Sequence, residues 1–139
     1  MIGIACALLL LEFFLPAEPD RQTWPEQLLL QRQALEEQKE EAHWRNRLAE
    51  AGENQPGLEQ AAMDAITAGN FLAAYKACGL LKPGAKRERI LNVLYAKARA
   101  SCATLGWALA ALEELDAGTR NRLAQELLNK WEDCQASRQ

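Results

Sequence analysis

The sequence predicts an all-α protein with three parts: an apolar N-terminal helix, a long polar helix, and four to five further helices arranged as a bundle or as an array of hairpins. Its 139 residues are dominated by Ala, Leu, Glu, Gln and Arg, which favour helices. β-branched residues, which a sheet needs, are few. They are Ile2, Ile4, Ile66, Ile90, Val93, Thr23, Thr67, Thr104 and Thr119.

Composition and chain breaks divide the chain into three segments. We expect an apolar segment at residues 1–17, a polar helix with its linker at residues 18–57, and a helical domain at residues 58–139. Apolar residues make up 49% of the chain and charged residues 25%, which is the balance of a folded protein. Each segment is justified in turn below.

The N-terminal segment is predicted to associate with a membrane. Residues 1–11 carry no charge, Glu12 follows, and residues 13–15 are again apolar. A membrane-spanning helix needs about 20 apolar residues, so residues 1–17 are near the lower limit for an anchor. The flanking charges leave the orientation open. A cleaved signal peptide and a helix buried within a soluble, cytoplasmic bundle are the two alternatives.

A polar helix is expected next, from its cap at Thr23 to about Ala51. Thr23 and Glu26 have the spacing of a capping box, and Pro25 is tolerated in a first helical turn. Gly52 can adopt the left-handed conformation that often follows a helix. A continuous helix over this range would be about 40 Å long at 1.5 Å per residue.

The apolar residues of this helix form one narrow stripe with a heptad spacing. The neighbouring row contains Gln31 and Gln38, where a full coiled-coil seam needs apolar side chains. The helix is therefore either a stalk, as in a coiled coil, or an arm packed along the rest of the domain. The stripe itself comprises Leu28, Leu35, Ala42 and Ala49.

An eight-residue pattern recurs in the C-terminal domain. Residues 67–74 and residues 104–111 both match T-x-G-x-x-L-A-A, at an offset of 37 residues. Period and content resemble a tetratricopeptide-like helical hairpin, in which a glycine turn precedes the second helix. The resemblance covers roughly residues 58–115 and implies stacked hairpins that bind a protein partner.

The first copy fits that resemblance better than the second. Gly69, Asn70 and Phe71 occupy the turn and the start of the second helix. In the second copy, Trp107 and Ala108 stand in the asparagine and aromatic positions. Further departures are Arg99 at a small-residue position and a closing proline that is missing or displaced to Pro83. The alternative is a plain bundle in which Gly69 and Gly106 allow close helix approach.

Two further breaks delimit the remaining helices. Residues 82–84, Lys-Pro-Gly, end one helix and begin the next. Thr119 is the expected N-cap of the last helix, which should run from about Arg120 to Cys134. Such a helix could cover the end of a repeat stack.

Charge is distributed unevenly, although the whole chain has a net charge of −3. Residues 12–59 carry eleven acidic and five basic side chains, whereas residues 82–99 carry six basic and one acidic. Cations at a helix N-terminus oppose the helix dipole, which suggests an anionic partner. That partner would be an acidic protein surface, anionic lipid or nucleic acid, and nucleic acid is disfavoured because the patch lacks interleaved aromatics. The alternative is a plain solvated face without a partner. The patch comprises Lys82, Lys86, Arg87 and Arg89.

No arrangement of residues indicates catalysis, a cofactor or a metal. The four cysteines lack C-x-x-C spacing, and His43 is the only histidine. If the domain is exported, two of Cys78, Cys102 and Cys134 could form a disulfide, and the pair Cys78–Cys102 is sterically conceivable. In a reducing compartment they would be small core residues.

The sequence therefore predicts a non-enzymatic helical module for protein–protein interaction. It would act as an adaptor or assembly factor, tethered to a membrane by residues 1–17, and it could form a homo-oligomer. One alternative is a soluble regulator or chaperone that buries its N-terminal helix in a bundle or dimer. A second alternative is a nucleic-acid-binding bundle that uses Lys86, Arg87 and Arg89.

Overall fold

The computed structural model describes residues 23–138, and this range folds as an all-α structure without strands. The expected apolar helix at residues 1–17 lies outside the described residues. None of the helices within residues 23–138 has the length and apolar character needed to cross a membrane. The elements are α2 (Glu26–Glu36), α3 (Ala42–Ala51), α4 (Gln55–Ala68), α5 (Phe71–Leu80), α6 (Ala85–Arg99), the 3₁₀ helix η1 (Cys102–Thr104), α7 (Leu105–Glu114) and α8 (Ala117–Ser137).

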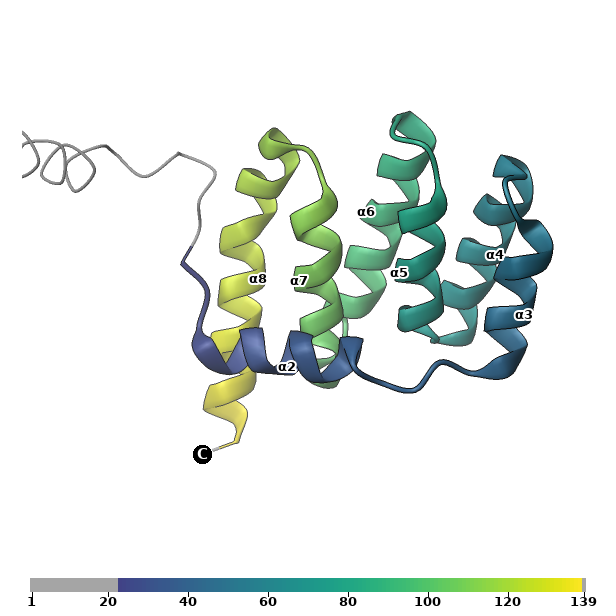
Figure 1. Ribbon diagram of the computed structural model, residues 1–139. Helices are drawn as coiled ribbons and strands as arrows, with labels where there is room; N and C mark the ends of the chain where they lie inside the picture. The colour runs from purple at the N-terminus through teal and green to yellow at the C-terminus, as the bar shows by residue number, and fades with distance from the viewer. Residues whose placement is uncertain (1–22, 139) are drawn as a thin grey trace, which may run out of the picture.

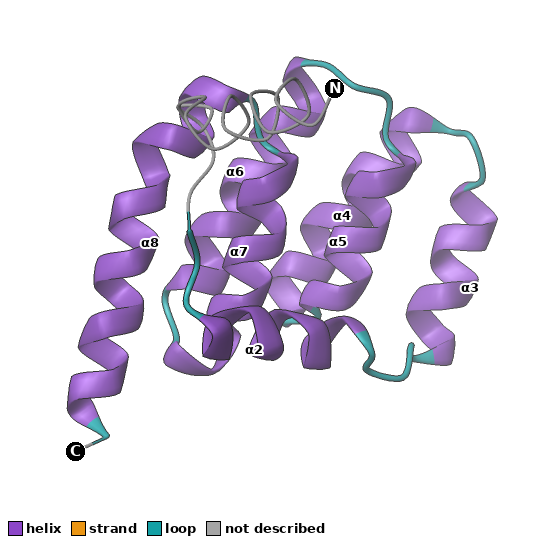
Figure 2. Cartoon of the chain, turned by 60° about the vertical axis from the view of Figure 1, so that its left-hand side comes forward, coloured by secondary structure: helices purple, strands orange, loops and turns teal. Residues whose placement is uncertain are grey.

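Helices α3 to α8 stand side by side, each antiparallel to the next, and α2 crosses the lower end of α7 (Figure 1). The most extensive packing joins α4 to α5 and α6 to α7, so these pairs form two hairpins. Contacts between α3, α5 and α7, and between α4 and α6, arrange the helices in two layers. Helix α8 packs on α7, and its C-terminal part extends well past the N-terminal end of α7 (Figure 2).

The prediction of a single polar helix that ends at about Ala51 is wrong, because residues 37–41 separate two helices. The two halves bury their apolar side chains against different parts of the molecule. Leu28 is fully buried where α2 crosses α7, whereas Trp44 is buried where α3 packs on α4. One straight helix cannot reach both places, so tertiary packing overrides the helical propensity of the connecting residues.

Three of the seven α-helices within residues 23–138 begin with a side-chain cap. Asn54, Asn70 and Asp116 accept hydrogen bonds from backbone N–H groups at the starts of α4, α5 and α8, respectively. Thr119, the expected cap of the last helix, is instead the residue whose N–H donates to Asp116. The capping box expected at Thr23 is not formed, because α2 starts after Pro25 without a side-chain cap.

The two copies of the recurring pattern lie at corresponding places in the two hairpins, but their glycines have different roles. Gly69 has a φ of 79° and ends α4. Gly106 lies inside α7, where a Cβ atom would be 2.6 Å from the backbone nitrogen of Arg32. Gly69 is therefore needed for a turn, and Gly106 for the close approach of α2.

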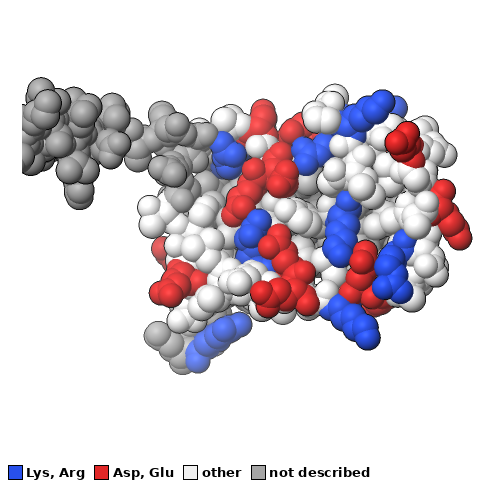
Figure 3. All heavy atoms as spheres, viewed as in Figure 1, with Lys and Arg blue, Asp and Glu red and all other residues white. Residues whose placement is uncertain are grey.

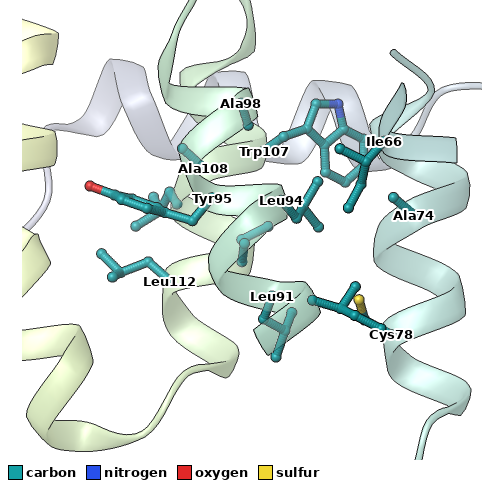
Figure 4. Packing of buried hydrophobic residues seen from close by; sticks show 14 of the residues in the cluster. Ile66, Ala74, Cys78, Leu91, Leu94, Tyr95, Ala98, Trp107, Ala108 and Leu112 are labelled. Carbon is teal, nitrogen blue, oxygen red and sulfur yellow. The ribbon is translucent and has the colours of Figure 1, made fainter. Parts of the chain in front are cut away.

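A single apolar cluster extends through the array and includes side chains from every helix. Figure 4 shows Cys78 of α5 beside Leu91 of α6, with Tyr95 and Leu112 farther along the cluster. Alanines along α4, α5 and α7 allow the helices of each hairpin to approach closely. Each fully buried leucine contributes about 2 kcal/mol relative to an exposed one. The array therefore depends mainly on apolar packing between neighbouring helices.

Candidate functional site

A concave feature of the described surface lies where residues 37–41 pass over the turn between α4 and α5. We call it the linker cleft, and its volume is about 410 Å³. Its lining comes from five α-helices, from η1, from the linker between α2 and α3, and from the turn between α4 and α5. It is lined by residues 38–41 and 68–73 together with Leu35, Trp44, Thr104 and Trp107.

Aromatic rings form the inner wall of the linker cleft, and polar groups form its rim. Trp44 is 7% exposed and Trp107 is 2% exposed, so both rings are fixed by the core. Phe71 is half-buried beside them, while Lys39 and Glu41 are exposed on the linker. Such a combination can enclose an apolar side chain and orient its polar flanks.

Ion pairs hold the linker and α3 in place beside the cleft. The carboxylate of Glu40 lies 3.1 Å from the ammonium group of Lys76 on α5. Arg47 of α3 pairs with Asp64 of α4, and this guanidinium, with a hydrogen bond from Gln60, lowers the pKa of the Asp64 carboxyl. These pairs are partly exposed, so each contributes little free energy.

Helix α2 is docked at the other side of the cleft through Gln31. The side-chain oxygen of Gln31 accepts a hydrogen bond from the Gly106 N–H at 2.7 Å, and its nitrogen donates to the Cys102 carbonyl oxygen at 3.2 Å. Arg32 adds an ion pair with Glu113 at 3.0 Å. The sequence places Gln31 on a polar row, and nothing in that pattern indicates a contact with residues more than 70 positions away.

A disulfide joins Cys102 of η1 to Cys134 of α8, and Cys78 is a buried free thiol. The pair Cys78–Cys102 considered from the sequence is not formed. Cys78 lies near the N-terminal end of α6, whereas Cys102 follows the C-terminal end of α6. Helix α6 has 15 residues and is thus about 22 Å long. Burial raises the pKa of the Cys78 thiol to about 12.

The four basic residues singled out in the sequence have different surroundings. Arg87 is partly buried, and it donates to the Cys78 carbonyl oxygen and pairs with Glu114, both at 3.0 Å. Lys86 lies 3.7 Å from Glu59 of α4. Lys82 and Arg89 are exposed and form no ion pair within residues 23–138. On the face shown in Figure 3, acidic and basic side chains of the described residues are interspersed.

Within residues 23–138, no group of three or more His, Cys, Asp or Glu side chains could hold a metal ion. His43 is exposed and contacts Trp44 edge-on, with ring centroids 5.1 Å apart. Comparison of the chain with family models, with curated proteins and with solved structures gives no match. The side chains that line the linker cleft supply apolar contact, hydrogen bonding and ion pairing.

Proposed function

We propose that this protein is a non-enzymatic interaction module, an adaptor or assembly factor, whose linker cleft binds a short peptide segment of a partner protein. The observation that carries the proposal is a rigid aromatic wall behind a rim with charges of both signs. Trp44 and Trp107 supply apolar contact at little entropic cost because packing already fixes them. Lys39 and Glu41 are available on the rim to orient the peptide.

We assign the array to the tetratricopeptide-like type, with α4–α5 and α6–α7 as its two hairpins. Three features support this assignment: consecutive antiparallel helices, two layers, and buried small residues at matching places in both hairpins. Those places are Ala73 and Ala74 in the first hairpin and Ala110 and Ala111 in the second. Arrays of this kind act through surfaces that several repeats build together.

The proposed location is a membrane surface, with residues 1–17 as the tether and the helical array in an oxidising compartment. The apolar sequence of residues 1–17 supports the tether. The Cys102–Cys134 disulfide supports the compartment, because such bonds persist outside the reducing cytosol. The nucleic-acid alternative is not favoured, since Arg87 already pairs with Glu114.

Peptide binding can be tested by selecting a displayed peptide library against the full chain in detergent micelles. Ala68 is exposed and lines the linker cleft, so Ala68→Trp should fill it. We expect selected peptides to lose at least tenfold in affinity for Ala68→Trp. Ala96→Trp, at an exposed position of α6 away from the cleft, is the matched control and should bind normally. Peptides that bind both variants equally would contradict the proposal.

The tether can be tested by flotation of the full chain with phosphatidylcholine vesicles. We expect the full chain to float with the vesicles, and a variant lacking residues 1–15 to stay soluble and keep its helical circular dichroism. If the deletion instead abolishes folding, the soluble regulator that buries its N-terminal helix would replace the tethered adaptor as the better description.

A further inference from the structure

The Cys102–Cys134 disulfide lies where three parts of the molecule meet. Cys102 belongs to η1, which leads directly into α7, and Cys134 belongs to the part of α8 that extends beyond α7. The carbonyl oxygen of Cys102 also accepts the hydrogen bond from Gln31 of α2. The same residue is thus bonded covalently to α8 and by a hydrogen bond to α2, so the disulfide fixes the backbone on which α2 docks.

Helix α2 is held by its packing on α7 and by a few polar contacts. It has eleven residues, and a helix this short is not stable by itself in water. Leu28 is its only buried residue, whereas Leu29 and Leu30 are 42% and 55% exposed. The ion pair between Arg32 and Glu113 is partly exposed and therefore contributes little. The two hydrogen bonds of Gln31 therefore add to the apolar packing that docks α2.

The linker cleft depends on the same contacts. Leu35 at the end of α2 and Gln38 of the linker form one side of it, and Thr104 of η1 lies on another. If α2 leaves α7, the linker loses its fixed end and the cleft loses that side. The position of α2 therefore determines whether the cleft is complete.

We propose that the Cys102–Cys134 disulfide is a redox latch, which when oxidised keeps α2 docked and the linker cleft complete, and when reduced releases α2. The regulation of the cleft rests on the peptide binding proposed above. The release of α2 does not rest on peptide binding, because it concerns only the disulfide and the contacts that dock α2.

The reductant that opens the latch is a dithiol of the kind found in thiol–disulfide oxidoreductases. Its thiolate attacks the sulfur of Cys102, which is partly exposed, rather than that of Cys134, which is 4% exposed. The S–S bond breaks, and Cys134 leaves as a thiolate that takes up a proton. The second thiol of the reductant then displaces Cys102, so the protein gains two electrons and two protons while the reductant becomes a disulfide.

The release of α2 can be followed by NMR of the full, ¹⁵N-labelled chain in micelles before and after addition of dithiothreitol. On reduction we expect the amide signals of residues 26–36 to move towards random-coil positions, while those of α4 and α5 keep their shifts. Cleavage by trypsin after Lys39 of the linker should accelerate at least tenfold. Unchanged α2 signals, or the simultaneous loss of all native signals, would overturn the latch.

Two sets of variants test whether the disulfide acts on α2 through Gln31. Gln31→Ala should release α2 while the disulfide stays intact, and Cys102→Ser/Cys134→Ser should show a released α2 that does not respond to dithiothreitol. Cys6→Ser/Cys78→Ala keeps the latch, so it should respond to dithiothreitol as the original chain does. If Gln31→Ala leaves α2 docked, the proposed route through Gln31 is wrong.

A last measurement separates the latch from the proposed peptide binding. Peptides selected on the oxidised protein should bind the reduced protein at least tenfold more weakly. If α2 is released but affinity is unchanged, the latch does not regulate the cleft. If no peptide binds in either redox state, the proposed function fails, while the NMR result still decides whether the latch exists.

Discussion

The two hairpins of the array close their turns in different ways. Between α4 and α5 the turn is local: Gly69 takes a positive φ and Asn70 caps α5. The turn between α6 and α7 has local hydrogen bonds too, since Ser101 caps η1 and the Thr104 hydroxyl donates to the Ala98 carbonyl oxygen. It also depends on distant parts of the chain, because α2 contributes Gln31 and α8 contributes Cys134. A similar sequence pattern thus occurs in a self-sufficient turn and in one that depends on the rest of the molecule.

This difference shows how the first and last helices of the described range are attached to the helical array. The first hairpin needs only its own residues to set its geometry. The second hairpin is the point at which the N-terminal and C-terminal helices of the described range are attached. Changes at the second turn should therefore cost more stability than changes at the first, and the following predictions test that order.

The largest expected effect comes from removing the disulfide at the second turn. The cross-linked residues are 32 positions apart. In the chain-entropy model a cross-link of this size stabilises the folded state by about 3–4 kcal/mol. We expect Cys102→Ser/Cys134→Ser to lower the free energy of unfolding by that amount in urea titrations monitored by circular dichroism. A loss below about 1 kcal/mol would mean that the second turn is held without its cross-link.

Gly106→Ala should have the next largest effect. The added Cβ would lie within 3 Å of three backbone atoms of α2, which belong to Gln31 and Arg32. Because backbone cannot rotate away as a side chain can, α2 must shift, and overpacking of this kind costs about 1–3 kcal/mol. Urea titration gives the stability, and loss of the trypsin resistance of the linker shows that α2 has moved.

Changes at the first turn should cost less. Gly69→Ala would place a Cβ in open space, so only the positive φ opposes it, at about 1 kcal/mol. Asn70→Ala removes the cap of α5 and should likewise cost about 1 kcal/mol. The same urea titrations apply. If Gly69→Ala proves more costly than Gly106→Ala, the proposed order of the two turns is reversed.

The smallest effect concerns chemical reactivity rather than stability. The pKa of the Cys78 thiol in the first hairpin is raised to about 12, and the reacting species in alkylation is the thiolate. At pH 8 iodoacetamide should therefore leave Cys78 unmodified in the folded protein and modify it in urea, as measured by mass spectrometry. Rapid labelling of the folded protein would show that α5 opens readily.

The helical class and most helix ends could be predicted from the sequence because they depend on local signals. Gly52, Gly69 and the Lys-Pro-Gly break at residues 82–84 all separate helices where expected. The break at residues 37–41 could not be predicted, since that stretch contains no glycine, proline or capping residue. It exists because the side chains on either side of it are buried against different helices.

The components of the candidate site are harder to recognise for the same reason. The basic patch could be recognised in the sequence, yet Arg87 pairs with Glu114, which is 27 positions away. Gln31 looks like an ordinary surface residue until α7 is placed beside it. The cysteine partner could not be chosen by spacing alone, because it depends on how far α8 extends past α7.

The crossing of α2 over α7 also has a consequence for the order of events during synthesis. Gln31 and the Gly106 N–H that it binds are 75 positions apart in the chain. The chain emerges from its N-terminus, at about 5–20 residues per second, so α2 has no docking surface for at least several seconds after it has been made. During that interval the hairpin α4–α5 can already close with its own residues. Binding partners that recognise a free α2 segment would therefore encounter it first on the growing chain.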